Sequence, residues 1–122
     1  MKVKIDTKEK FNVIVMEEAH LSANMTEAIK ELVISFKDKE IKNVIFKMGN
    51  VMTLDYGIAS TLAEIQQSFY DGNCSFVICE IQKEVENFLD REGLLEMLNI
   101  TPTESEAWDI VQMEEIEREY LD

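Results

Sequence analysis

The chain has 122 residues, of which 46% are hydrophobic, and its formal net charge is -13. This length predicts one domain spanning residues 1–122, and the hydrophobic content is enough for one core, which argues against a disordered chain. Phosphate backbones repel so acidic a surface, and no apolar run is long enough to cross a bilayer, so neither nucleic-acid binding nor membrane insertion is expected.

The N-terminal sequence and the cysteines bear on the cellular compartment in which the protein is expected. The opening sequence MKVKIDTKEK lacks the apolar stretch of a signal peptide. Cys74 and Cys79 lie five positions apart in one predicted strand, and this odd offset places them on opposite faces, where they do not bridge. Buried, reduced thiols fit a cytosolic protein, so we expect a cytoplasmic location.

The first 40 residues predict a hairpin followed by a helix. Residues 2–6 and 11–16 have the composition of two short strands, joined by a turn over residues 7–10. A helix is expected to begin at Asn24, whose side chain can cap it with Glu27 as the reciprocal partner. The apolar stripe of this helix consists of Met25, Ile29, Leu32, Val33 and Phe36.

The middle of the chain predicts a central strand and a second helix. The strand covers residues 43–48, and Asp55 is expected to cap the helix that follows. The sequence Asp71-Gly72-Asn73 ends this helix, because glycine and asparagine favour turns. Its apolar stripe consists of Ile58, Leu62, Ile65 and Phe69.

The last third predicts one more strand and two helices. Residues 74–81 form the strand and residues 83–92 a helix, with Gly93 at its left-handed C-terminal position. Pro102 precedes the final helix, which Thr103 and Glu106 begin as a capping box. The residues expected to pack this helix onto the core are Ala107, Trp108, Ile110 and Val111.

The order of elements is therefore β-β-α-β-α-β-α-α. Strands separated by helices favour parallel pairing with right-handed crossovers, whereas the opening hairpin is antiparallel. We expect an α/β fold with a mixed sheet of four to five strands and flanking helices.

Candidate groups for catalysis or metal binding are sparse. His20 is the only histidine, and it lies between two predicted elements, so a solvated loop position is expected. No glycine-rich phosphate loop and no metal-ligand spacing occur, and the carboxylates lie mostly on polar helix faces, where they are poor general acids. The sequence therefore predicts a protein that is not an enzyme and has no cofactor and no metal.

The last twenty residues are strongly acidic. They carry eight carboxylates against the single cation of Arg118, and two interpretations stay open. The helix can present a solvated outer face, or it can present an acidic docking surface for a basic partner. The acidic residues are Glu104, Glu106, Asp109, Glu114, Glu115, Glu117, Glu119 and Asp122.

The turn at Asp55 combines geometry with chemistry. A helix N-terminus offers unpaired N–H donors and a partial positive charge of about half a unit, so it tolerates an anion. The alternative is that Asp55 only caps the helix.

The sequence VIFKMGNVMTLDYG, from Val44 to Gly57, resembles the core of the STAS domain, the fold of bacterial anti-sigma factor antagonists. The family has an apolar strand, then a Val, then an apolar residue and an Asp followed by Ser, Ser or Thr, and Gly. This chain matches with its apolar strand, with Asn50-Val51 and with Leu54-Asp55, without a gap. Residues 88–95 and 103–108 resemble two later family segments, so the resemblance covers residues 40–110 and implies a STAS-like fold.

The chain departs from the family at the regulatory position. The resemblance implies a phosphorylatable hydroxyl two positions after Asp55, where this chain has Gly57. Tyr56 occupies the position of the family's Ser before the phosphorylated residue, and Ile58 occupies that of the Gly after it. Lys47 occupies a position where the family often has an Asp. Ser60 and Thr61, one turn further along the helix, are the nearest substitute hydroxyls.

These observations lead to three hypotheses about the function of the protein. The first is a non-enzymatic interaction module that docks an anti-sigma factor or a kinase-fold regulator through Asp55, Tyr56, Gly57 and Ser60, without the usual Ser switch. The second is a scaffold or accessory subunit of a larger complex, such as a lipid-transport assembly, with Tyr56 as an interface anchor. The third, a nucleotide binder or enzyme, lacks a glycine loop to support it.

Overall fold

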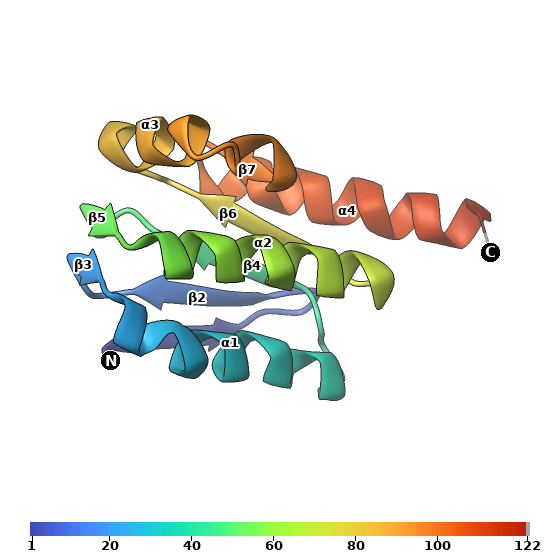
Figure 1. The fold of residues 1–122 in the computed structure, drawn as a ribbon. Helices are drawn as coiled ribbons and strands as arrows, with labels where there is room; N and C mark the ends of the chain where they lie inside the picture. The colour runs from blue at the N-terminus through green and yellow to red at the C-terminus, as the bar shows by residue number, and fades with distance from the viewer. Residues whose placement is uncertain (122) are drawn as a thin grey trace.

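The centre of the structure is a five-stranded sheet in the order β1-β2-β4-β6-β7 (Figure 1). The computed structural model describes residues 1–121. β1 pairs with β2 in antiparallel fashion, and every other neighbouring pair is parallel. The predicted α/β fold, mixed sheet and N-terminal hairpin are therefore confirmed. The strands are β1 (Val3–Thr7), β2 (Asn12–Met16), β4 (Val44–Lys47), β6 (Phe76–Cys79) and β7 (Ile100–Thr101).

Four helices cover the two faces of this sheet unequally. Side chains from three of them, α1 (Thr26–Ser35), α2 (Tyr56–Asp71) and α3 (Lys83–Arg91), join one large core with the alternate strand residues that include Phe46 and Phe76. The fourth helix, α4 (Glu104–Leu121), packs on the opposite face against Ile45 and Val77. Since β1 is not among the strands that α4 chiefly contacts, this outer strand is exposed along most of its length, whereas Phe11 and Val13 in the β2 part of the hairpin are buried beside α4.

The predicted apolar stripes lie where the periodicity places them. In α2, Ile58, Leu62, Ile65 and Phe69 are all buried. In α4, Ala107 and Val111 are buried, and Trp108 packs its ring 4.7 Å from that of Phe11 at the start of β2. Burial of both faces of the central strands and of every third or fourth helix residue explains why these elements form.

The two cysteines lie on opposite faces, as the odd offset predicts. Cys74 belongs to the core beneath α2, and Cys79 belongs to the smaller core beneath α4. Both thiols are free and buried, and burial raises the pKa of Cys79 to about 12. The strand itself is shorter than the predicted residues 74–81, because Cys74 still bonds back to α2 and Glu80 turns away with a φ of 63°.

Predictions of helix ends were right at α3 and α4 and wrong at α1. Gly93 has a φ of +74° after α3, and Thr103 Oγ1 accepts the Glu106 N–H at 3.2 Å at the start of α4. Asn24 does not cap α1. A 3₁₀ turn, η1 (Ala23–Met25), precedes the helix, so Asn24 lies inside that turn and its side chain bonds to the Ser22 hydroxyl.

Three strands of only two residues each were not predicted, namely β7 at the edge of the main sheet, β3 (His20–Leu21) and β5 (Thr53–Leu54). β3 and β5 form a separate parallel pair beyond the main sheet. They precede η1 and α2 respectively, so the chain enters both helices from the same place (Figure 1). His20 is exposed, as expected, but it belongs to this strand pair rather than to an irregular loop.

Candidate functional site

The β3–β5 pair fixes the two chain segments that lead into η1 and α2. The backbone N–H groups of Met52 and Thr53 donate to the Ala19 carbonyl at 2.7 and 3.2 Å. The imidazole Nδ1 of His20 lies 2.7 Å from Thr53 Oγ1. On the other side, the Gln82 side chain donates to the Gly49 carbonyl at 2.7 Å. The loop before α2 is therefore held from both sides and is preorganised.

Asp55 is the residue immediately before α2, but its carboxylate does not cap that helix. Its backbone N–H donates to the Leu21 carbonyl at 2.9 Å, and its Oδ2 accepts the Ala23 N–H at 2.7 Å. The prediction that the Asp55 side chain caps α2 is therefore wrong, because its carboxylate bonds to Ala23 in η1 instead. The reason is tertiary, because the β3–β5 pair places the free amide of η1 within reach of a side chain 32 residues away.

The side chains around this turn face solvent. Asp55 and Met52 are exposed, and Tyr56 keeps 54% of its surface exposed at the first residue of α2. Gly57 and Ser60 are half-buried. We call Met52, Asp55, Tyr56, Gly57 and Ser60 the α2-start surface. It is open to a large molecule, and its aromatic and thioether groups are typical of protein interfaces.

Position 57 has room for a side chain. A Cβ at Gly57 would lie 3.7 Å from Thr26 Oγ1 and 4.0 Å from the Ala23 Cβ, which are ordinary contacts. The hydroxyl nearest to this position is therefore that of Thr26, at the start of α1, which sequence reasoning missed. Of the two hydroxyls expected as substitutes, Thr61 is buried, with 6% of its surface exposed, and only Ser60 remains partly accessible.

Lys47 lies at the end of β4 and faces α4 rather than α2. Its Nζ is 3.1 Å from Glu104 Oε1 and 3.4 Å from Glu80 Oε2. The hydrogen bond to Glu104 raises the pKa of Lys47, with a smaller contribution from Glu80. The two carboxylates neutralise the lysine, so Lys47 ties three segments of the fold together.

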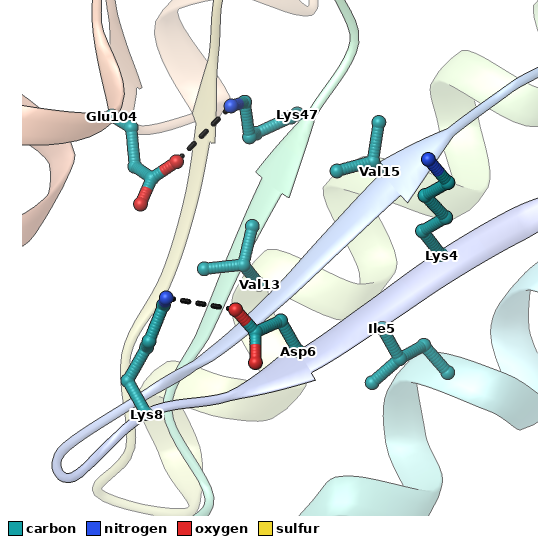
Figure 2. A pocket seen from close by; sticks show the side chains of 8 residues that line it. All are labelled: Lys4, Ile5, Asp6, Lys8, Val13, Val15, Lys47 and Glu104. Atoms are coloured by element: carbon teal, nitrogen blue, oxygen red, sulfur yellow. Dashed lines mark hydrogen bonds and ion pairs between the residues drawn. The ribbon is translucent and has the colours of Figure 1, made fainter.

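A second feature is a hollow of about 390 Å³ beside the hairpin (Figure 2). Its apolar side chains include Val13 and Val15, and around these Figure 2 shows two ion pairs, Lys8 with Asp6 at 2.7 Å and Lys47 with Glu104. Lys4 also lines the hollow, with its Nζ 3.8 Å from Glu17 Oε2. Because each cation of the lining lies near a carboxylate, the hollow offers a ligand little uncompensated charge. We therefore place the candidate site at the α2-start surface.

Other site types have little support in the described part of the chain. Between residues 1 and 121 we find no group of three or more His, Cys, Asp or Glu side chains placed to hold a metal ion. No helix within the same range is both long and apolar enough to span a membrane.

Sequence reasoning proposed Asp55, Tyr56, Gly57 and Ser60, whereas Met52 and the hydroxyl of Thr26 became candidates only from the structure. No periodicity marks these positions, because β3 and β5 are too short to show alternation. An exposed methionine between two strands is the one local signal that could have indicated Met52.

Comparisons with known proteins agree on one family. The model of the STAS domain matches residues 2–107. No curated protein sequence matches the chain at a significant level. A proposed anti-sigma factor antagonist from Thermotoga maritima has a similar structure, with a TM-score of 0.76 and 19% identity over 90% of this chain and 94% of that one.

Two further solved structures extend the comparison. The anti-sigma factor antagonist SpoIIAA in its unphosphorylated form has a TM-score of 0.71 and 14% identity, over 91% of this chain and 96% of its own. The murine solute carrier 26 family member A9, an anion transporter, has a TM-score of 0.71 and 16% identity, over 84% of this chain but only 18% of its own. At these identities, the likeness concerns the fold.

Proposed function

Because the chain belongs to the STAS domain family, we propose that it is a non-enzymatic interaction module that docks a regulatory protein through the α2-start surface. The partner we expect is an anti-sigma factor or another kinase-fold regulator, since similar folds include anti-sigma factor antagonists. The observation that carries the proposal is an exposed tyrosine and carboxylate on a turn braced by two hydrogen bonds of Asp55.

The geometry supports binding through rigidity. Asp55 bonds to both Leu21 and Ala23, so the turn does not need to become ordered when a partner arrives. Tyr56 supplies a large amphipathic ring, the kind of side chain that often dominates binding energy at interfaces. Met52, four residues earlier in the chain segment that leads into α2, is also exposed and can adapt to an irregular partner surface.

We further propose that partner binding is not switched by phosphorylation at position 57. Glycine has no hydroxyl, so a kinase cannot add at this residue the charge of about -1.5 to -2 that a phosphate carries. Replacing Gly57 with Asp introduces a negative charge there, and the Cβ of the new side chain would make only ordinary contacts. The Gly57→Asp variant is therefore expected to bind the partner more weakly than the unchanged chain.

The test uses tyrosines at the two ends of α2. Candidate partners are the anti-sigma factors and kinase-fold proteins encoded beside this chain in its native genome, and binding is measured by calorimetry. Tyr56→Ala should weaken binding ~10-fold or more, as the loss of an aromatic anchor does. Tyr70→Ala is the matched control, because Tyr70 lies near the other end of the helix with 75% of its surface exposed. Equal losses in both variants would contradict the proposed surface.

A second test addresses regulation. The protein is incubated with each kinase-fold candidate and ATP, and modified residues are mapped by mass spectrometry. We expect no stoichiometric phosphate near the α2-start surface. Phosphate on Ser60 or Thr26 would overturn constitutive binding while leaving the docking surface intact.

The alternative is a scaffold or accessory subunit, such as a component of a lipid-transport assembly. It has one specific support, because the similar region of the murine transporter is a small part of a much longer chain. The same α2-start surface would then contact a fixed neighbour in the complex. Co-purification of a membrane ATPase complex that is lost with Tyr56→Ala, together with no binding to kinase-fold candidates, would favour this alternative.

A further inference from the structure

The outer face of α4 carries an apolar stripe that none of the described residues covers. Met113, Ile116 and Tyr120 keep 59%, 52% and 85% of their surfaces exposed. Successive residues of a helix are about 100° apart, so these three side chains lie on the side opposite Ala107 and Val111, which face the sheet. The stripe extends about 10 Å along the helix.

The inner face explains why this stripe stays outward. Glu114 accepts a bond from Asn99 at 3.3 Å, Glu115 from Asn43 at 2.9 Å, and Arg118 donates to Ser75 at 3.2 Å. These bonds hold the second half of α4 against the sheet in one rotation. The three apolar side chains cannot turn inward without breaking them.

The stripe has the spacing of a coiled-coil seam. Met113, Ile116 and Tyr120 occupy consecutive a, d and a positions of a heptad, which places Glu117 at e and Glu119 at g. Both Glu117 and Glu119 are exposed. A carboxylate therefore borders the apolar seam on each side, which is the arrangement that selects a partner helix with basic residues at its own e and g positions.

We propose that the outer face of α4 is a docking surface for a basic amphipathic helix of another protein, with Lys or Arg beside its apolar seam. A second copy of this chain is disfavoured, because both flanking positions are Glu and would face Glu in either helix orientation. The net charge of -13 also favours a basic partner over a second copy of this acidic chain.

This surface is separate from the α2-start surface. In Figure 1 α2 begins at the end of the molecule beside β5, whereas α4 runs to the C-terminus at the other end. The two surfaces can therefore engage two partners at once, and substitutions on α4 test this proposal independently of the proposed function. Of the eight acidic residues noted in the sequence, Asp122 lies outside the described residues.

The experiment uses the full chain and three designed peptides of about 21 residues, a length at which a helix is stable enough to measure. One has a Leu and Ile seam flanked by Lys, one has the same seam flanked by Glu, and one is a scrambled form of the first. Fluorescence anisotropy is recorded at low salt. We expect the Lys peptide to bind ~10-fold or more tightly than either other peptide, a ratio that corresponds to about 1.4 kcal/mol.

Four variants locate the binding. Ile116→Ser should weaken binding of the Lys peptide ~5-fold or more, whereas Met97→Ser, at a comparably exposed methionine on another element, should not change it. Glu117→Lys with Glu119→Lys should reverse the preference toward the Glu peptide. Asp90→Lys with Glu92→Lys makes the same change in net charge at exposed positions elsewhere and should leave the preference unreversed. Thermal melting confirms that each variant is folded.

Three results would overturn the proposal. One is equal binding of the Lys peptide and its scrambled form, because the acidic surface would then attract any cation without using the seam. Another is unchanged binding after Ile116→Ser in a folded protein. The third is a dimer in sedimentation experiments that Ile116→Ser dissociates, which would assign the stripe to self-association.

Discussion

Asp55 shows how one side chain can serve a different purpose from the one its position suggests. It stands where a helix cap is expected, yet its carboxylate bonds to the Ala23 N–H in η1. Its backbone N–H adds a second bond, to Leu21, so one residue connects the starts of two helices. A partner at the α2-start surface would therefore contact a turn whose shape depends on this residue.

Removing the carboxylate tests that role. Asp55→Ala should lower the free energy of unfolding by about 1 kcal/mol, because the Ala23 amide loses a charge-assisted acceptor that is partly screened by solvent. Urea denaturation measures the change, and hydrogen exchange should show faster exchange at Ala23. Asp90→Ala, at an exposed carboxylate of α3, is the control and should change the stability little. Unchanged exchange at Ala23 would contradict the role assigned to Asp55.

Two glycines should respond to alanine in opposite directions. Gly57→Ala should raise the free energy of unfolding by about 0.5 kcal/mol, since alanine favours the helix and the added Cβ makes only ordinary contacts. Gly93→Ala should lower it by about 1 kcal/mol, because a φ of +74° is unfavourable for any residue with a Cβ. Chemical denaturation of both variants gives the comparison. Destabilisation by Gly57→Ala would show that position 57 needs glycine for a structural reason.

Lys47 links whole elements, because it joins the end of β4 to Glu80 after β6 and to Glu104 at the start of α4. It replaces the acidic residue that the family resemblance leads one to expect there. The hydrogen bond to Glu104 raises the pKa of Lys47 above its ordinary 10.5. The stabilisation from this cation is therefore complete below pH 10.5 and is lost as the pH rises through the raised pKa.

This sign can be tested by comparing the unchanged chain with Lys47→Met. The difference in the free energy of unfolding between the two proteins should be constant from neutral pH to about pH 9 and should shrink above pH 10.5. Denaturant unfolding at a series of alkaline pH values measures it. Lys83→Met is a suitable control, because this lysine is exposed and pairs only within its own helix, with Glu86. A difference that grew with pH would contradict the assigned ion pairs.

The charge of the protein as a whole also has a measurable consequence. With 25 acidic residues against 12 basic ones, the folded chain repels itself, and salt screens that repulsion. The melting temperature should rise by about 3 °C or more between roughly 10 mM and 500 mM sodium chloride. The variant with Glu117→Lys and Glu119→Lys should show a smaller rise. A melting temperature that fell with salt would mean that ion pairs, rather than net repulsion, dominate.

The sequence by itself determined the order and faces of the long elements. Runs of apolar and β-branched residues predicted the hairpin and the β4 strand, and burial of every third or fourth residue of a helix let periodicity predict the buried stripe of α2. Local chemistry also predicted Gly93 and the Thr103 cap, because each depends on residues within one turn. The predicted helix start at Asp55 and the resemblance to the STAS domain led to Asp55, Tyr56, Gly57 and Ser60 as candidate site residues.

Only the tertiary structure decided what depends on contacts between distant segments. The β3–β5 pair redirected Asp55 to Ala23 and brought Thr26 beside Gly57, and the packing of α2 buried Thr61. No local pattern contains that information. The exposure of the apolar stripe on α4 is a second example. Its heptad spacing can be read from the sequence, but the hydrogen bonds that fix the rotation of the helix come from Asn43, Ser75 and Asn99. Periodicity is a property of one segment, whereas partners and exposure are set by the segments packed around it.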